Sequence, residues 1–231
     1  GRIALRAVDE QPLEGGRLGL WVEGAVEIDD LEISNGLAAA YRFDDVETDW
    51  QPSAGRWIEH NGMTCIAWDH WIGAEADPDA LLWNTFVWPE HTTASVWVSE
   101  STDGEENGHH VHHPYHSIQF IVGGNGRSAD AGYRFLIAGG PVKNLTQLLR
   151  NGEVVAESRA FRIVMGGHCN SPRTFHITVR REGAGIGLWI DGRSILAYDD
   201  PAPLGPGRIG FGCTGCRADF KDFLAFVDKP W

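Results

Sequence analysis

The fold is decided by FHITVRREGAGIGLWIDGRSILAYDDPAPLGPGRIGFG, residues Phe175 to Gly212. Apolar and polar residues alternate in its three runs, at Thr174–Glu182, Ile186–Gly192 and Gly207–Cys213. A period of two is typical of strands that bury one face. The Asp191-Gly192 pair favours a tight hairpin turn, because both central residues of such a turn need positive φ. We therefore predict consecutive antiparallel strands in this stretch.

The same alternation recurs in earlier parts of the chain. Further runs of this type lie at Thr93–Ser101, Ser117–Gly124 and Gly132–Gly140, and each is bounded by turn-forming residues. The composition is turn-rich, with 29 Gly, 11 Pro and only 2 Met. Many short strands at this spacing predict an all-β protein, an antiparallel β-sandwich.

Charge and hydropathy restrict the partners. The formal net charge is −13 at pH 7, whereas nucleic acids and anionic membranes are bound through clustered Lys and Arg. The sequence also lacks the roughly 18 consecutive apolar residues of a membrane span. We therefore expect neither nucleic-acid binding nor membrane insertion, and a neutral ligand or a cation fits the charge better.

The beginning of the chain repeats its end. The identical positions are Gly1, Arg2, Leu5, Asp9, Pro12, Leu13, Gly16, Arg17, Gly19 and Gly24, which recur in the same order and spacing between Gly192 and Gly215. A repeat of this length indicates a copied structural unit. We predict that residues 1–35 form the terminal hairpin of a preceding repeat and that residues 36–231 form a complete domain. The alternative is that residues 1–35 add strands to the same sandwich.

Several stretches together resemble a known superfamily. They are YRFDDVETDW and GRWIEHNG near the start, GYRFLI and LLRNGEVVAE in the middle, and the stretch quoted first followed by DFKDFLAFV. Their order resembles the concanavalin A-like lectin/glucanase superfamily, and within it laminin-G-like jelly rolls near the 3-keto-disaccharide hydrolase domain family. The resemblance implies two curved sheets with any ligand on the concave face or its rim. Because this superfamily contains lectins, hydrolases, lyases and inert spacers, it leaves function open.

Aromatic residues supply the first ligand-binding candidates. Among Asp, Pro and Gly in the segment Ala67–His91 stand Trp68, His70, Trp71 and Trp88. Indoles beside carboxylates and imidazoles suit sugar rings, whose apolar face can stack on an aromatic side chain. The alternative is that these residues pin a long loop onto the sandwich. We expect Trp57 and Trp189, which lie in strand contexts, to fill the core.

Side-chain direction along the predicted strands supplies further candidates. In each run the polar residues alternate with core residues, so that they leave the core on one side. We predict that a single concave face carries Trp97, Gln119, His176 and Arg180, together with Ser95, Ser99, Ser117 and Thr178. The alternative is that these residues form the solvated side of a sheet.

Half of the ten histidines lie in one short segment. They are His109, His110, His112, His113 and His116. His110 and His112 share a face of an extended segment, where they could bind Zn²⁺, Cu²⁺ or Ni²⁺; a polar exposed loop is the alternative. Apart from a divalent metal that this pair could bind, we expect no cofactor.

Cysteine usage and one sequon bear on location. Cys213 and Cys216 align with Val22 and Ala25 of the first copy, so they are present or absent together, which favours a local disulfide. A zinc site that includes Cys169 is the alternative, and Cys65 could pair with Cys169. Four cysteines and the sequon at Asn144 favour an extracytoplasmic or secreted protein.

Two functions of different classes follow. The first is a non-catalytic carbohydrate-binding module of a larger secreted protein, whose partners are a poly- or oligosaccharide and the other domains of that protein. The second is a glycan-cleaving hydrolase or lyase, with or without the assistance of a metal. For the enzyme, the candidate catalytic residues are His110, His112, His176, Tyr133 and Arg134. A third reading is a structural repeat without a small ligand.

Overall fold

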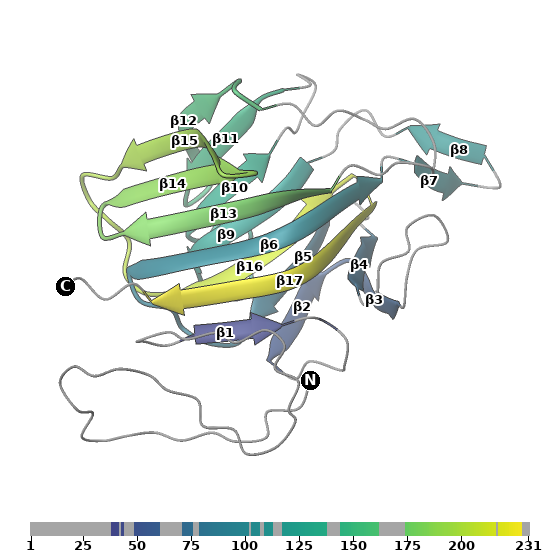
Figure 1. Cartoon of the computed structure of the whole chain (residues 1–231), viewed down its shortest axis with the longest axis horizontal. Helices are drawn as coiled ribbons and strands as arrows, with labels where there is room; N and C mark the ends of the chain where they lie inside the picture. The colour runs from purple at the N-terminus through teal and green to yellow at the C-terminus, as the bar shows by residue number, and fades with distance from the viewer. Residues whose placement is uncertain are drawn as a thin grey trace, which may run out of the picture.

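The computed structural model contains two antiparallel sheets packed face to face (Figure 1). The residues it describes are 38–41, 43, 49–60, 71–75, 79–101, 103–106, 109–112, 117–137, 144–161, 174–215 and 217–227. Within these ranges only the backbone is described at 58–60, 71–75, 100–101, 103–106, 109–112 and 217. The predicted copy at residues 1–35 lies outside the described residues, so that division of the chain stays a prediction.

The larger sheet has eight strands, and its central strands face the viewer in Figure 1. In spatial order they are β15 (Arg193–Asp199), β14 (Gly185–Ile190), β13 (Thr174–Glu182), β6 (His91–Ser101), β17 (Arg217–Val227), β4 (Trp71–Glu75) and β3 (Arg56–His60), with β1 (Ala38–Tyr41) paired to β17. Strands far apart in sequence therefore become neighbours, because β6 lies between β13 and β17.

The second sheet has seven strands and lies behind the first in Figure 1. In spatial order they are β12 (Glu153–Ser158), β11 (Thr146–Arg150), β10 (Tyr133–Ile137), β9 (Ser117–Gly124), β16 (Arg208–Thr214), β5 (Asp79–Asn84) and β2 (Trp50–Ala54). The central strand β9 pairs with β10 on one side and with β16 on the other.

A separate hairpin of β7 (Asp103–Glu106) and β8 (His109–His112) is set off from both sheets.

A short turn connects two neighbouring strands of the larger sheet. Between β14 and β15, Asp191 and Gly192 have φ of 50° and 75°. Both central residues are left-handed, which confirms the tight turn predicted there. Among the described residues there is no helix long and apolar enough to cross a membrane.

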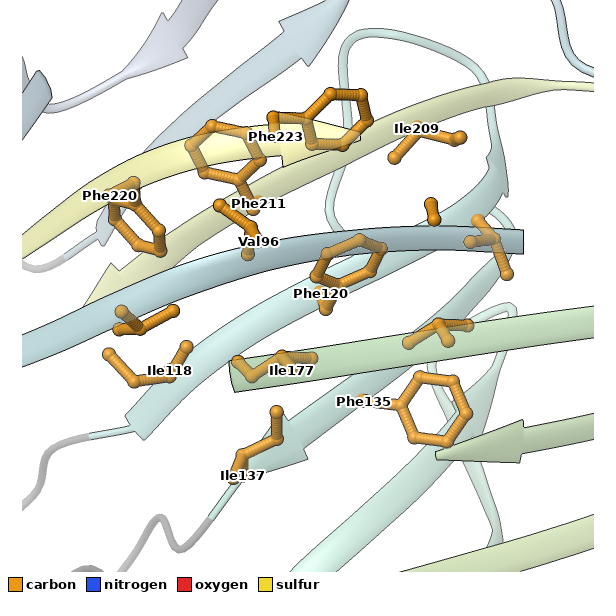
Figure 2. Close-up of a cluster of buried hydrophobic side chains, with 14 of the residues drawn as sticks. Val96, Ile118, Phe120, Phe135, Ile137, Ile177, Ile209, Phe211, Phe220 and Phe223 are labelled. Atoms are coloured by element: carbon orange, nitrogen blue, oxygen red, sulfur yellow. The ribbon is translucent and has the colours of Figure 1, made fainter. Parts of the chain in front are cut away.

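The core lies between the two sheets and is formed by the alternating apolar residues (Figure 2). From the eight-stranded sheet come Val96, Phe175, Ile177, Phe220 and Phe223, and from the seven-stranded sheet come Ile118, Phe120, Phe135, Ile137 and Phe211. All are buried, and Phe211 packs against Phe220 with 4.6 Å between ring centroids. The predicted antiparallel β-sandwich is therefore confirmed, and each sheet has an outer face turned away from this core.

Candidate functional site

The predicted polar face is divided between the two sheets. His176 stands opposite Trp97 in the register of β13 and β6, and Arg180 lies on the same outer face of the eight-stranded sheet. Gln119 instead lies on β9, in the seven-stranded sheet. Its neighbours Ile118 and Phe120 point into the core, so Gln119 points to the outer face of that sheet. The prediction of one face with Trp97, Gln119 and His176 is therefore wrong, because alternation does not tell which sheet a strand joins.

The tryptophans of the predicted loop have different positions. Trp88 is 2% exposed and belongs to the core, and its indole N–H donates to Oδ1 of Asn84 at 3.1 Å. Its backbone also pairs with Gly207. The prediction that Trp88 contacts a ligand is therefore wrong. Trp68 and His70 lie outside the described residues, and only the backbone of Trp71 in β4 is described.

Tyr133, a candidate for the enzymatic alternative, is part of a buried structural cluster. Its hydroxyl donates to Oδ2 of Asp200 at 2.6 Å and accepts the backbone N–H of Leu204 at 2.9 Å. Nε of Arg150 donates to the same carboxylate oxygen at 2.6 Å, and Arg181 lies over the phenol ring, 5.2 Å from its centroid. Burial raises the pKa of Tyr133, and its hydrogen bond to Asp200 adds to the rise. Tyr133 is fully buried, so the proposed catalytic role is wrong.

The remaining polar residues of the seven-stranded sheet form a second cluster on its outer face. Gln119 is 1% exposed, and its amide N–H₂ donates to Oδ1 of Asp79 at 3.2 Å and to the hydroxyl of Thr214. The Thr214 hydroxyl in turn donates to Oδ1 of Asp79 at 2.6 Å. These side chains come from β9, β5 and β16, which are adjacent strands. The amide oxygen of Gln119 is buried and has no hydrogen-bond partner among the described residues.

Arg134 extends this cluster onto the next strand. The register of β10 with β9 places Leu136 opposite Gln119 and Arg134 opposite Ile121, so Arg134 and Gln119 are diagonal neighbours on one face. The Arg134 side chain is 14% exposed, and Nη1 pairs with Asp130 at 3.1 Å. Burial lowers the pKa of Arg134, and the carboxylates of Asp130 and Asp79 oppose this change only in part. Its Nε–H is buried and has no acceptor among the described residues.

The other end of this outer face is apolar. Leu81, Trp83 and Ile121 form a small buried cluster separate from the main core. The Trp83 ring lies against Gly210, because a Cβ atom there would be 2.6 Å from the ring. We call the group Asp79, Gln119, Arg134 and Thr214 the open polar cluster; it adjoins this apolar end.

Sequence reasoning found half of this cluster. Gln119 was found from alternation and Arg134 from the resemblance, but Asp79 and Thr214 were missed. Asp79 follows Pro78 and reads as a turn residue, and Thr214 lies between two cysteines that suggest a disulfide. One signal was available for Thr214. It follows Phe211 and Cys213 at the end of an alternating run, so alternation places it on the face opposite to those two residues.

The predicted metal and disulfide residues are described only in part. The backbone register of β7 and β8 places His110 opposite Glu105 and His112 opposite Asp103, and their side chains are not described. Among the described residues no group of three or more His, Cys, Asp or Glu side chains could hold a metal ion. Cys213 is buried in β16, whereas Cys216 lies outside the described residues. Both the metal at His110 and His112 and the disulfide stay predictions.

Two sheets with this strand order define the class of fold, a concanavalin A-like jelly roll. Solved structures agree, including the carbohydrate-binding module CBM66 from Bacillus subtilis, at 16% identity and a TM-score of 0.57 over 78% of this chain and 96% of that one. A second is the Ca²⁺/Man-bound exoplasmic/lumenal domain of VIP36, at 12% identity and a TM-score of 0.57 over 84% of this chain and 91% of that one. A third is the β-glucanase of Bacillus licheniformis, at 11% identity and a TM-score of 0.52 over 85% of this chain and 100% of that one. No family model matches the chain, and no curated protein matches its sequence. At these identities the likeness shows the fold alone.

Proposed function

We propose that this chain is a carbohydrate-binding module whose ligand lies on the outer face of the seven-stranded sheet, over the open polar cluster. The observation that carries the proposal is the pair formed by the Gln119 amide oxygen and the Arg134 Nε–H. Both atoms are buried, both lack hydrogen-bond partners among the described residues, and both belong to one sheet face. A buried polar atom without a partner costs about 1–3 kcal/mol. A ligand that bonds both atoms recovers that cost.

The position of these two atoms separates them from three other buried polar atoms without partners among the described residues. Single atoms of this kind also occur at Trp50, Thr146 and Arg181. Trp50 belongs to the main core. Thr146 and Arg181 each lie two residues from a core residue of the same strand, Leu148 and Val179, and therefore share its face. These side chains therefore face the interior of the sandwich. Gln119 and Arg134 face outward from adjacent strands of the seven-stranded sheet.

The chemistry of the cluster favours hydroxyl groups as the ligand. Gln119 offers an acceptor and Arg134 offers a donor, and a sugar hydroxyl can satisfy either one because it both donates and accepts. A phosphate is disfavoured, because the Asp79 carboxylate already acts electrostatically on Arg134. The net charge of −13 also opposes polyanions. Structures of the same fold include one named as a carbohydrate-binding module, which supports this choice.

The test is a glycan array followed by calorimetry with the best glycan, using the wild type and Arg134→Gln. Removing a charged donor from a bound ligand should cost about 1.5–3 kcal/mol, a loss of roughly tenfold to more than a hundredfold in affinity. The matched control is Arg159→Gln, at an exposed arginine beyond the end of β12. Equal affinity of both variants and the wild type would remove the ligand from this face.

We further infer a finer classification and a location. The pattern Asp191-Gly192, Pro203-Leu204 and Gly207 to Gly210 supports a laminin-G-like jelly roll near the 3-keto-disaccharide hydrolase domains. The four cysteines and the sequon at Asn144 support an extracytoplasmic module joined to other domains of a secreted protein. Mass spectrometry after treatment with a thiol-alkylating reagent under denaturing conditions tests the predicted disulfide. If Cys213 and Cys216 are the two cysteines that escape alkylation, the disulfide is supported. Alkylation of both contradicts it.

A further inference from the structure

The outer face of the eight-stranded sheet carries two indoles that the open polar cluster does not use. Trp97 lies on β6 and is 37% exposed, and among the described residues it is the only Trp, Tyr or Phe that is exposed rather than buried or half-buried. Trp189 lies on β14 and is half-buried. Leu188 and Ile190 on either side of it point into the core, so Trp189 points outward. The expectation that Trp189 fills the core is therefore wrong.

Neighbouring residues fix the positions of both rings. The His176 imidazole lies 4.9 Å from the Trp97 ring, with 35° between the two planes. On the other side, Lys221 of β17 stands opposite Trp97. The Trp189 ring lies against the backbone of Gly187, because a Cβ atom built there would be 2.5 Å from Cη2. A side chain at position 187 would therefore displace this indole.

The spacing of the two indoles suits an extended chain of sugars. β13 separates β6 from β14, so Trp97 and Trp189 are two strand spacings apart across the sheet, roughly 10 Å. The registers also offset them by one side-chain row, because Thr178 stands opposite both Ser95 and Trp189. On the strand between them, His176 stands beside Trp97 and Thr178 stands beside Trp189. Two apolar planes with a polar group between them match alternate rings of an oligosaccharide, each of which has an apolar face and a hydroxyl edge.

The surroundings of the indoles disfavour a protein partner. The other exposed large apolar side chains among the described residues are Val87 and Val154, and neither lies on a strand of this sheet. Around the rings stand polar residues, including Ser95, Thr178 and Arg180. Protein interaction sites are commonly contiguous apolar patches of several hundred Å², and these rings are isolated within a polar surface.

We propose that this face is a second saccharide site, in which a neutral oligosaccharide runs across β6, β13 and β14 and stacks on Trp97 and Trp189. Because the two sites are on opposite outer faces of the sandwich, one module would hold two glycan chains and cross-link them. The identity of the ligand class rests on the proposed function, but the position of the site does not.

The test follows the indole N–H signals of Trp97 and Trp189 in ¹⁵N-labelled full chain, assigned with Trp97→Phe and Trp189→Phe. The probes are cellohexaose, laminarihexaose, mannohexaose and xylohexaose, each titrated separately. We expect one probe to shift both signals, to keep its affinity for this face in Arg134→Gln, and to lose at least tenfold in Trp97→Ala and Trp189→Ala. Trp97→Phe should recover most of the loss, and Val154→Ala is the control.

Three results separate this inference from the proposed function. If no probe moves either signal while Arg134→Gln still weakens binding, the second site does not exist and the first one stands. If both signals move but Arg134→Gln changes nothing, the indole face alone binds sugar. If the signals stop moving in Arg134→Gln, there is one site and the inference is wrong. Wild-type protein should also agglutinate beads coated with the bound glycan, and either single-face variant should not.

Discussion

Tyr133 and Arg134 are adjacent on β10 but belong to two polar clusters, which differ in whether their buried polar atoms have hydrogen-bond partners. Tyr133 points inward to Asp200, where the phenol oxygen and both carboxylate oxygens have hydrogen-bond partners. Arg134 points outward to the open polar cluster, where its Nε–H and the amide oxygen of Gln119 lack partners among the described residues. Both clusters are largely buried and both combine arginine with aspartate. In the first cluster the side-chain oxygens of Tyr133 and Asp200 all have partners within the protein, and the second cluster is completed by a ligand in our proposal.

The difference has an energetic meaning. In the cluster of Tyr133 and Asp200, burial acts to raise the pKa of Asp200, but hydrogen bonds from Tyr133, Ala202 and Arg150 outweigh it and the net pKa falls below the usual range. The folded state therefore favours the charged carboxylate, which anchors the turn after β15 to β10 and β11. In the open polar cluster, two buried atoms have no hydrogen-bond partner among the described residues. Such atoms are rare in folded proteins, and a bound ligand is the explanation that we propose.

The largest effect is expected from breaking the cluster of Tyr133 and Asp200. Asp200→Ala removes the acceptor of Tyr133 and Arg150 at once, so the free energy of unfolding should fall by about 3 kcal/mol, the lower limit for breaking a buried ion pair. Urea denaturation measures this change. The control Asp199→Ala alters the exposed neighbouring carboxylate and should stay within about 0.5 kcal/mol of the wild type. An equally small change in both variants would show that Asp200 does not anchor the fold.

The opposite pattern is expected in the open polar cluster. Gln119→Leu keeps the Thr214–Asp79 hydrogen bond of 2.6 Å, so the free energy of unfolding should change by less than about 1 kcal/mol. Glycan affinity should fall about tenfold, or ~1.4 kcal/mol, because the ligand loses its acceptor. The matched control is Gln51→Leu on the edge strand β2. A loss of stability as large as that of Asp200→Ala would make this cluster structural too.

This comparison also shows what the sequence can predict. Alternation in Ser117–Gly124 and Thr174–Glu182 was sufficient to identify core residues such as Phe120 and Ile177, because burial of one strand face is a local property. Whether Gln119 and His176 share a face depends on sheet assignment, which is decided by the distant pairs β9–β16 and β6–β13. Trp88 and Trp189 exchanged their expected roles, Trp88 lying in the core and Trp189 on an outer face. An indole in a loop-like segment can be buried by a bridge to Gly207, and one in a strand can point outward.

The smallest effect concerns His176, beside the exposed Trp97. Burial lowers the pKa of His176 from its ordinary 6.5, and the Asp191 carboxylate opposes this change only in part. The unfolded chain therefore binds this proton more readily than the folded protein does. The free energy of unfolding should accordingly rise with pH from the lowered folded-state pKa up to about 6.5 and then level off.

His176→Gln removes this contribution and keeps a polar side chain beside the indole. Urea midpoints of the wild type should fall between pH 7.5 and pH 5 by more than those of His176→Gln. The exposed His91 provides the control His91→Gln, which should keep the wild-type dependence on pH. If His176→Gln instead retains it in full, protonation of the imidazole does not act on the folded state. The stacking face at Trp97 would then bind its sugar equally well over this pH range. A half-buried imidazole that is neutral in the folded protein instead predicts weaker binding at pH 5, because its protonation loosens the contact that holds the indole.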